Sequence, residues 1–150
     1  MKLRSAGISG FLAISVLVLF LVTVGGCDYI TGAATNVTPA SLPVINNITP
    51  EEANDVIMFS GFFTQIIDVR TPQEYAAGHI PNAVNIDFNA ADFKENLSVL
   101  DKNVNYIVYC RTGMRSAAAS KVMAELGFKY INNMIGGFSD WAAAGLPVEQ

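Results

Sequence analysis

The apolar positions divide the chain into segments of different character. Residues 8–24 carry no charged side chain and are mostly Leu, Val, Ile and Phe, after a short basic start at Lys2 and Arg4. This layout is typical of a secretory signal, which does not belong to the fold. The apolar run of 17 residues is barely long enough to span a bilayer. A retained transmembrane anchor is therefore the alternative interpretation.

The segment after the apolar run has a different composition. Residues 28–47 are rich in Thr, Ala, Asn and Pro and show neither helical nor strand periodicity. Such a segment is typical of a flexible tether. We therefore predict a signal at residues 1–26, a flexible linker at residues 27–47 and one folded domain at residues 48–150.

From residue 48 onward, short apolar runs alternate with helical patterns. Residues 49–52 form a helix start, with Thr as the N-cap, Pro in the first turn and two acidic residues after it. Strands are predicted at residues 65–69, 83–86, 104–109 and 130–134, and further helices at residues 72–77, 90–97, 115–126 and 139–144. Strands that alternate with helices of this length predict an α/β fold, with a mostly parallel central sheet covered by helices on both faces.

The charge balance narrows the classes of partner. Residues 1–26 hold two of the basic residues and none of the acidic ones, which leaves 7 Lys and Arg against 13 Asp and Glu in the rest of the chain. An acidic domain argues against binding to nucleic acid and against electrostatic adhesion to anionic lipid. We therefore expect any contact with a membrane to be made through the N-terminus.

The chain has two cysteines, Cys27 and Cys110, in very different surroundings. Cys27 ends the apolar segment in the run Val24-Gly25-Gly26-Cys27, which resembles the processing signal of bacterial lipoproteins. That resemblance implies cleavage before Cys27 and attachment of lipid, palmitate included, to its sulfur. We then expect an exported protein, anchored to a membrane by its N-terminal lipid, with the domain on the extracytoplasmic side. An incidental cysteine is the alternative.

The second cysteine follows the most apolar predicted strand, so Cys110 is expected at the carboxyl edge of the sheet, where ligands bind in open α/β folds. Gly113 allows a sharp turn into the next helix, and the backbone N–H groups of that turn converge at a helix N-terminus. A thiol placed there has a depressed pKa and reacts as a thiolate. Arg111 and Arg115 add positive charge, which suits an anionic substrate. The alternative is a cysteine buried as a small apolar side chain.

Three separated motifs in residues 48–150 resemble the rhodanese family. The first is Ile67-Asp68-Val69-Arg70 with Glu74-Tyr75 and Gly78-His79-Ile80-Pro81-Asn82-Ala83. The second is the loop Cys110–Arg115, which has the form Cys-x-x-Gly-x-Arg. The third is Gly136-Gly137-Phe138-x-x-Trp141 with Gly145-Leu146-Pro147. This resemblance implies a three-layer rhodanese-like fold with a central sheet of about five strands. One departure is Asn82, where the family often has Gly.

The resemblance also implies an activity. Members of the family are sulfurtransferases, so Cys110 is expected to take a sulfane sulfur from a small anionic donor such as thiosulfate and hold it as a persulfide. An unknown thiol or protein would then accept the sulfur, without a cofactor or a metal. The residues expected to bind substrate are Arg111, Thr112, Gly113, Met114 and Arg115.

Other residues of the motifs are expected to support the fold around the loop. Asp68 and Arg70 end a strand on the same edge as Cys110 and are expected to hold neighbouring loops. Glu74 is expected to support Arg70 or a turn. The single histidine, His79, is expected to be mainly structural, although a general-base role for it stays open.

Two alternative functions remain. One is a non-catalytic sulfur carrier or docking module displayed on a membrane. The other is a small phosphatase or arsenate reductase, since cysteine phosphatases use a related loop with five residues between Cys and Arg. Here only four residues separate Cys110 from Arg115, and the next position holds Ser116. The smaller loop favours sulfur over phosphate.

Overall fold

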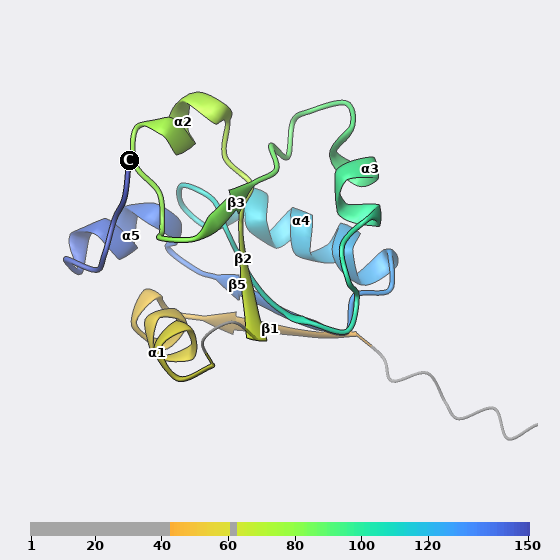
Figure 1. The fold of residues 1–150 in the computed structure, drawn as a ribbon, viewed down its shortest axis with the longest axis horizontal. Helices are drawn as coiled ribbons and strands as arrows, with labels where there is room; N and C mark the ends of the chain where they lie inside the picture. The colour runs from red at the N-terminus through yellow and green to blue at the C-terminus, as the bar shows by residue number, and fades with distance from the viewer. Residues whose placement is uncertain (1–42, 61–62) are drawn as a thin grey trace, which may run out of the picture. The chain divides into compact units, whose positions relative to one another are not determined.

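The computed structural model describes residues 43–60 and 63–150 (Figure 1). The strands are β1 (Val44–Ile48), β2 (Thr64–Asp68), β3 (Ala83–Asn85), β4 (Asn105–Tyr109) and β5 (Tyr130–Met134). The helices are α1 (Pro50–Ser60), α2 (Pro72–Ala76), α3 (Phe93–Ser98), α4 (Met114–Glu125) and α5 (Gly137–Ala143). The predicted apolar signal and Cys27 lie outside the described residues. No helix in the described ranges is long and apolar enough to cross a membrane.

The strands form one sheet in the order β1-β5-β4-β2-β3, and every neighbouring pair is parallel. Strand β4 therefore occupies the middle of the sheet, between β5 and β2, with helices over both faces of the sheet (Figure 1). The predicted α/β fold with a parallel sheet of about five strands and helices on both faces is confirmed.

The first strand was not predicted. Residues 44–47 were expected to belong to the flexible linker, but β1 pairs with β5 in register from Val44 opposite Tyr130 to Ile48 opposite Met134. The linker prediction is therefore wrong for these four residues. The reason is that β1 lies at the edge of the sheet with its first four residues exposed. Its polar Asn46 and Asn47 hide the alternation that identifies a half-buried strand.

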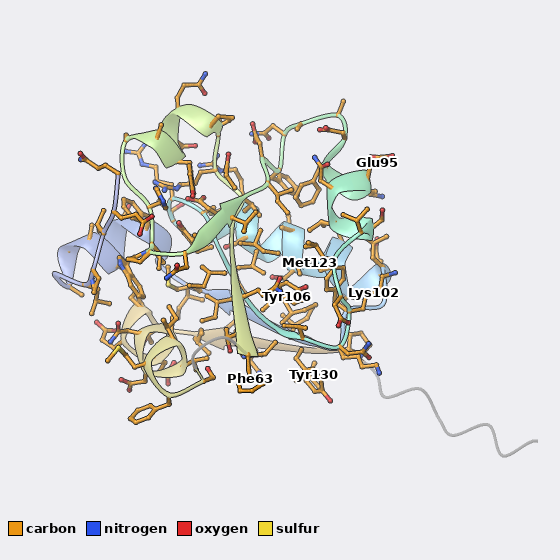
Figure 2. All side chains as sticks on the ribbon, in the orientation of Figure 1. Phe63, Glu95, Lys102, Tyr106, Met123 and Tyr130 are labelled. Carbon is orange, nitrogen blue, oxygen red and sulfur yellow. The ribbon has the colours of Figure 1, made fainter. Side chains whose placement is uncertain are left out.

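The sheet separates two apolar clusters, because successive side chains of a strand point to opposite faces. On β4, Tyr106 and Val108 pack under α3 and α4, whereas Ile107 and Tyr109 pack under α1 and α5. Figure 2 shows Tyr106 near Met123 of α4, and both side chains are fully buried. The central strand is therefore buried on both faces, which fixes the position of the residue that follows it.

A row of polar side chains crosses four strands near the amino-terminal edge of the sheet. Asn46 donates to the side-chain oxygen of Asn132 at 3.2 Å, and Asn132 donates to that of Asn105 at 2.8 Å. Asn105 then donates to the hydroxyl of Thr64 at 3.0 Å. Asn132 is buried and also donates to the Tyr106 carbonyl at 3.0 Å. This row joins the edge strand β1 to the centre of the sheet.

Replacement of the central amide of this row should destabilise the fold. Asn132→Ala leaves the polar groups of Asn105 and Tyr106 with one partner fewer in a buried place, which costs about 1–3 kcal/mol of unfolding free energy. The measurement is urea denaturation followed by the fluorescence of the single tryptophan, the buried Trp141. The matched control is Asn96→Ala on the exposed side of α3, which should stay within about 0.5 kcal/mol of the native chain. Equal stability of the two variants would contradict the role of the row.

Candidate active site

Cys110 occupies the place that the sequence predicts for it. It directly follows β4 at the carboxyl edge of the sheet, between the ends of β2 and β5, and its side chain is only 1% exposed. The backbone N–H of Val69 donates to the Tyr109 carbonyl at 2.9 Å, which ties the end of β2 to the residue before the cysteine. The carbonyl of Cys110 accepts the N–H of Phe138 in α5 at 2.8 Å. The cysteine is thus held between the end of β2 and the start of α5.

The loop after Cys110 curls back onto its sulfur. Gly113 has a φ of +94°, in the left-handed region that favours glycine, and its N–H lies 3.2 Å from the Cys110 Sγ. A Cβ at this position would also lie 3.3 Å from the backbone nitrogen of Gly136. The predicted glycine turn is therefore needed both for its conformation and for its close approach to the neighbouring turn.

The surroundings of the sulfur favour its anionic form. Burial alone would raise the pKa of the Cys110 thiol, but backbone N–H groups of Ser116, Thr112 and Gly113, together with the Ser116 hydroxyl, lower that pKa below its ordinary value. The Ser116 hydroxyl also lies 3.1 Å from the Gly113 carbonyl, and its single proton can go to only one acceptor at a time. The backbone N–H groups are therefore the steadier contribution. The depressed pKa agrees with the sequence-based expectation.

Arg115 closes the loop by an ion pair that sequence reasoning missed. Its guanidinium donates to both carboxylate oxygens of Glu74 in α2, at 2.8 and 2.9 Å. The hydrogen bonds from Arg115 lower the pKa of Glu74 to about 2. The same carboxylate accepts the N–H of Thr71 at 3.0 Å in a capping box at the start of α2. Glu74 thus supports a turn, as expected, but its cationic partner is Arg115 and not Arg70.

The remaining loop side chains differ in exposure. The side chains of Arg111, Thr112 and Met114 are exposed, and Met114 is 79% exposed. Of these three residues, Thr112 contributes its backbone N–H to the environment of the Cys110 sulfur. The loop therefore presents N–H groups on its inner side and a mixed polar and apolar rim to solvent.

The third sequence motif holds the loop from the side of α5. Gly136 and Gly137 have φ values of +72° and +61°, and a Cβ on Gly137 would clash with the carbonyl oxygen of Cys110. This close approach lets the N–H of Ser139 donate to the Arg111 carbonyl at 3.0 Å. The two glycines therefore allow the start of α5 to fix the backbone of the loop.

Asp68 and Arg70 form a buried ion pair beside the loop. Asp68 is fully buried and Arg70 is 4% exposed, with the Arg70 Nη2 at 2.6 Å from the Asp68 carboxylate. The same Nη2 donates to the Gly78 carbonyl at 2.7 Å, and the guanidinium lies 4.1 Å from the centre of the Phe138 ring. The pair joins the end of β2 to the segment after α2 and to α5. These contacts fit the supporting role that was expected.

His79 is engaged in the fold. It is buried, its ring stacks on that of Tyr75 with 3.8 Å between centroids, and its Nε2 lies 3.4 Å from the Glu149 carboxylate. Its Nδ1 lies 3.2 Å from the Tyr75 carbonyl. Both ring nitrogens therefore have partners within the fold. In the part of the chain that the structure describes, no group of three His, Cys, Asp or Glu residues is placed to hold a metal ion.

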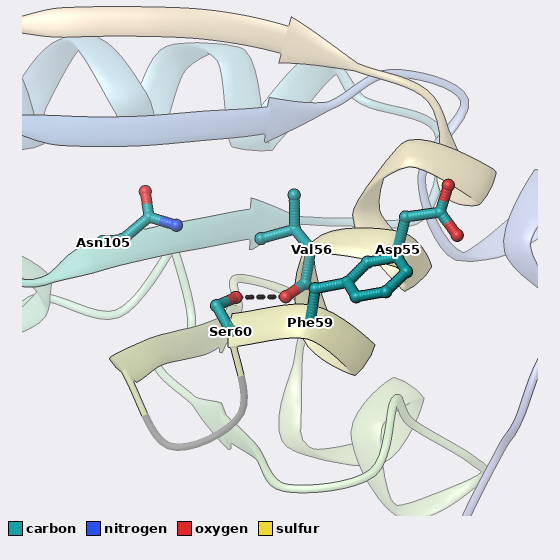
Figure 3. A pocket seen from close by; sticks show the side chains of 5 residues that line it. All are labelled: Asp55, Val56, Phe59, Ser60 and Asn105. Carbon is teal, nitrogen blue, oxygen red and sulfur yellow. Dashed lines mark hydrogen bonds between the residues drawn. The ribbon is translucent and has the colours of Figure 1, made fainter.

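Two cavities differ in their relation to Cys110. The larger, of about 410 Å³, is lined by residues of α1 together with Asn105, the first residue of β4 (Figure 3). Cys110 comes five positions after Asn105 along extended chain, which corresponds to about 17 Å. The smaller cavity, of about 230 Å³, borders the loop itself and is lined by Arg70, Glu74, Gly78, Arg111, Phe138 and Ser139. The larger cavity is therefore remote from the cysteine, and the smaller one adjoins the loop that follows it.

Comparisons with known proteins agree with this arrangement. The family model described as "Rhodanese-like domain" matches residues 49–144. The putative sulfurtransferase YtwF of Bacillus subtilis is 42% identical over 82 residues, which cover 55% of this chain and 77% of the relative. Thiosulfate sulfurtransferase PspE of Escherichia coli is 36% identical over 76 residues, which cover 51% and 72%. A rhodanese-like domain protein from Staphylococcus aureus has a crystal structure that is 32% identical, with a TM-score of 0.60, covering 70% of this chain and 99% of that one.

The hydrogen bonds to the sulfur predict a difference between two buried serines of α4. Ser116→Ala removes one hydrogen bond to Cys110 and should raise the pKa of its thiol, so that the thiolate forms at higher pH. Ser120→Ala, one turn further along, removes a buried hydroxyl that has no partner among the described residues and should leave that pKa unchanged. The measurement is a pH titration of the ultraviolet absorbance of the thiolate, with the Cys110→Ser chain as the blank. The same shift in both variants, or none in Ser116→Ala, would contradict the assignment.

Proposed function

Because this chain belongs to the rhodanese-like family, we propose that it is a sulfurtransferase that carries sulfane sulfur on Cys110. The rhodanese-like domain and the sulfurtransferase relatives support sulfur transfer as the general activity. The observation that carries the proposal is the loop of N–H groups around the Cys110 Sγ, with Gly113 N at 3.2 Å. Fixed N–H donors of this kind stabilise an anion on sulfur without a cofactor.

The proposed reaction has two steps. In the first, the Cys110 thiolate attacks the outer sulfur of thiosulfate, so that a bond forms between Sγ and that sulfur. The sulfur–sulfur bond of thiosulfate breaks, and sulfite leaves with the bonding electron pair. The product is a Cys110 persulfide anion, which the N–H groups of the loop hold. Donors other than thiosulfate that carry a sulfane sulfur would react in the same way.

In the second step an outside acceptor discharges the persulfide. A thiolate or cyanide attacks the terminal sulfur, the bond to Sγ breaks, and Cys110 leaves as a thiolate. The order is therefore ping-pong, with a covalent intermediate between two half-reactions. No oxidant or reductant is consumed, because each half-reaction exchanges one bond to the transferred sulfur for another.

The ion pair at the end of the loop favours sulfur chemistry over phosphate chemistry. A cysteine phosphatase needs the arginine that closes its loop to bind the phosphoryl oxygens. In this structure both nitrogens of the Arg115 fork are paired with Glu74. That arrangement adds to the short spacing between Cys110 and Arg115 as support for a sulfur substrate.

We propose in addition that the domain works outside the cytoplasm on a lipid anchor at Cys27. Support comes from the sequence alone, in the apolar run at residues 8–24 and the Val-Gly-Gly-Cys run at its end. A tether between this anchor and β1 would keep the active site accessible to partners in the surrounding space. The acceptor would then be a thiol or a protein of the same compartment.

The persulfide gives a direct test of the enzymatic role. After treatment with thiosulfate, the native chain should gain about 32 Da, the mass of one sulfur atom, on the peptide that contains Cys110. Cys110→Ser should show no gain on this peptide and should lose essentially all sulfur transfer to cyanide, while its urea denaturation stays close to that of the native chain. Mass spectrometry and a thiocyanate assay measure the two effects.

The possible results separate the alternatives. If the chain gains sulfur but transfers it to none of the small acceptors, it would be a carrier for a partner protein. A chain that never gains sulfur would be a docking module, and the proposed activity would then be wrong. Hydrolysis of a phosphate ester without sulfur transfer would indicate a phosphatase.

The lipid anchor has its own test in a bacterial host that makes lipoproteins. The native chain should incorporate labelled palmitate and should begin at Cys27 after processing, because the modified cysteine becomes the first residue. Cys27→Ser should show neither change, whereas Cys110→Ser should behave like the native chain. The measurement is palmitate labelling together with the mass of the N-terminal peptide. A native chain that keeps residues 1–26 without lipid would show a retained anchor instead.

A further inference from the structure

The smaller cavity beside the loop contains a cation that the proposed sulfur chemistry does not use. Among the described residues, the hydrogen bonds of the Arg70 side chain employ its Nε and Nη2 atoms, which bind Asp68 and Gly78. None of these hydrogen bonds uses Nη1. Arg70 is 4% exposed and lines the cavity, so its guanidinium borders this space.

The guanidinium of Arg70 is rigidly held in that position. Asp68 binds one edge of it, the Gly78 carbonyl accepts from it, and the Phe138 ring stacks against its face at 4.1 Å. A cation that is held in this way is a preorganised binding group for an anion. The donors do not have to be reordered when the ligand binds, which lowers the entropic cost of binding.

The charges around the cavity leave an excess of positive charge. Arg70 is balanced by Asp68, and Glu74 in the cavity wall is balanced by Arg115. Arg111 is exposed at the rim and has no ion-pair partner among the described residues. The Phe138 ring supplies an apolar wall, so the cavity combines a cationic end with an apolar side.

The cavity also adjoins the reactive loop and the partner of its last residue. Arg111 directly follows Cys110, and Glu74 holds Arg115 at the other end. Figure 1 shows the loop between β4 and α4 with α2 and α5 beside it, and these two helices supply Glu74 and Phe138 to the cavity. The cavity therefore borders the loop that begins at Cys110.

We infer that this cavity binds the carboxylate of a small acceptor thiol, with Arg70 and Arg111 as the anion-binding groups. The inference rests on the proposed sulfurtransferase function and specifies the class of its acceptor. The acceptor thiolate attacks the terminal sulfur of the Cys110 persulfide, a new sulfur–sulfur bond forms on the acceptor, and Cys110 leaves as a thiolate. The thiol loses its proton to solvent before the attack, and its carboxylate stays unchanged.

The test compares acids with their amides in the discharge step alone. The full chain is first treated with thiosulfate to form the persulfide, and the remaining thiosulfate is removed. The loaded chain is then mixed with mercaptopropionate or mercaptopropionamide in single-turnover experiments. The two thiols have the same number of heavy atoms and differ in charge. Their intrinsic reactivities also differ, but that difference cancels when the ratio of their rate constants is compared between variants of the protein. A shorter pair, mercaptoacetate and mercaptoacetamide, repeats the comparison at a second length.

Two variants at the cavity rim provide the matched pair. Ser139 is exposed and lines the cavity, so Ser139→Glu places a negative charge there and Ser139→Gln adds the same bulk without charge. The rate constant for the acid divided by that for its amide should be about fivefold lower in Ser139→Glu than in Ser139→Gln. The reason is that the new anion repels the carboxylate across a partly solvated distance. Arg111→Gln should also lower the ratio relative to the native chain, since it removes a rim cation. Asn96→Glu on α3 changes the net charge equally and should keep the native ratio.

The outcomes distinguish this inference from the function on which it rests. Equal ratios in Ser139→Glu and Ser139→Gln at both lengths would overturn the carboxylate site, while persulfide formation and its discharge would still stand. An effect of the Ser139 charge on loading by thiosulfate, with none on discharge, would assign the cavity to the donor and overturn the inference. A mass spectrum that shows no added sulfur atom on Cys110 after thiosulfate treatment would overturn the proposed function, and the inference with it.

Discussion

The rest of the site depends on one interaction, the contact between the buried Cys110 sulfur and the N–H groups of the loop after it. A sulfur that is 1% exposed loses the solvation that would stabilise its anion, so the protein has to replace that solvation with fixed donors. The Gly113 N–H at 3.2 Å and its neighbours do so, with the result that the thiol pKa is lowered despite burial. The same donors can hold the charge of a persulfide, which is also an anion on sulfur at this place.

That loop can exist only because other parts of the fold leave room for it. Gly113 supplies the positive φ of the turn, and Gly137 allows the α5 backbone to approach the Cys110 carbonyl without a clash. Arg115 fixes the far end by pairing with Glu74, which is itself held in the capping box of α2. Three segments that are distant in sequence, around residues 71–74, 110–116 and 136–139, therefore act together on one side chain.

Sequence reasoning could find the features that leave a local signal. The buried strand, the glycine turn and the position of Cys110 all follow from residues that are adjacent in the chain. The pair of Glu74 with Arg115 could not be predicted in this way, since 41 positions separate the two residues and either could have had another partner. Strand β1 was missed because an exposed edge strand with polar Asn46 and Asn47 lacks the apolar alternation of a half-buried one. Its contribution becomes visible only with the side-chain row that links it to the centre of the sheet.

The distribution of charge near Cys110 separates the groups that hold the fold from the one that faces solvent. Two of the arginines near Cys110 are neutralised by carboxylates, Arg70 by Asp68 and Arg115 by Glu74, and these pairs hold the backbone around the sulfur. The groups closest to the buried sulfur are then N–H dipoles, whose attraction for an anion falls off faster with distance than that of a full charge. The charge of Arg111, which has no ion-pair partner among the described residues, lies at the exposed rim, where it can attract an anion from solvent.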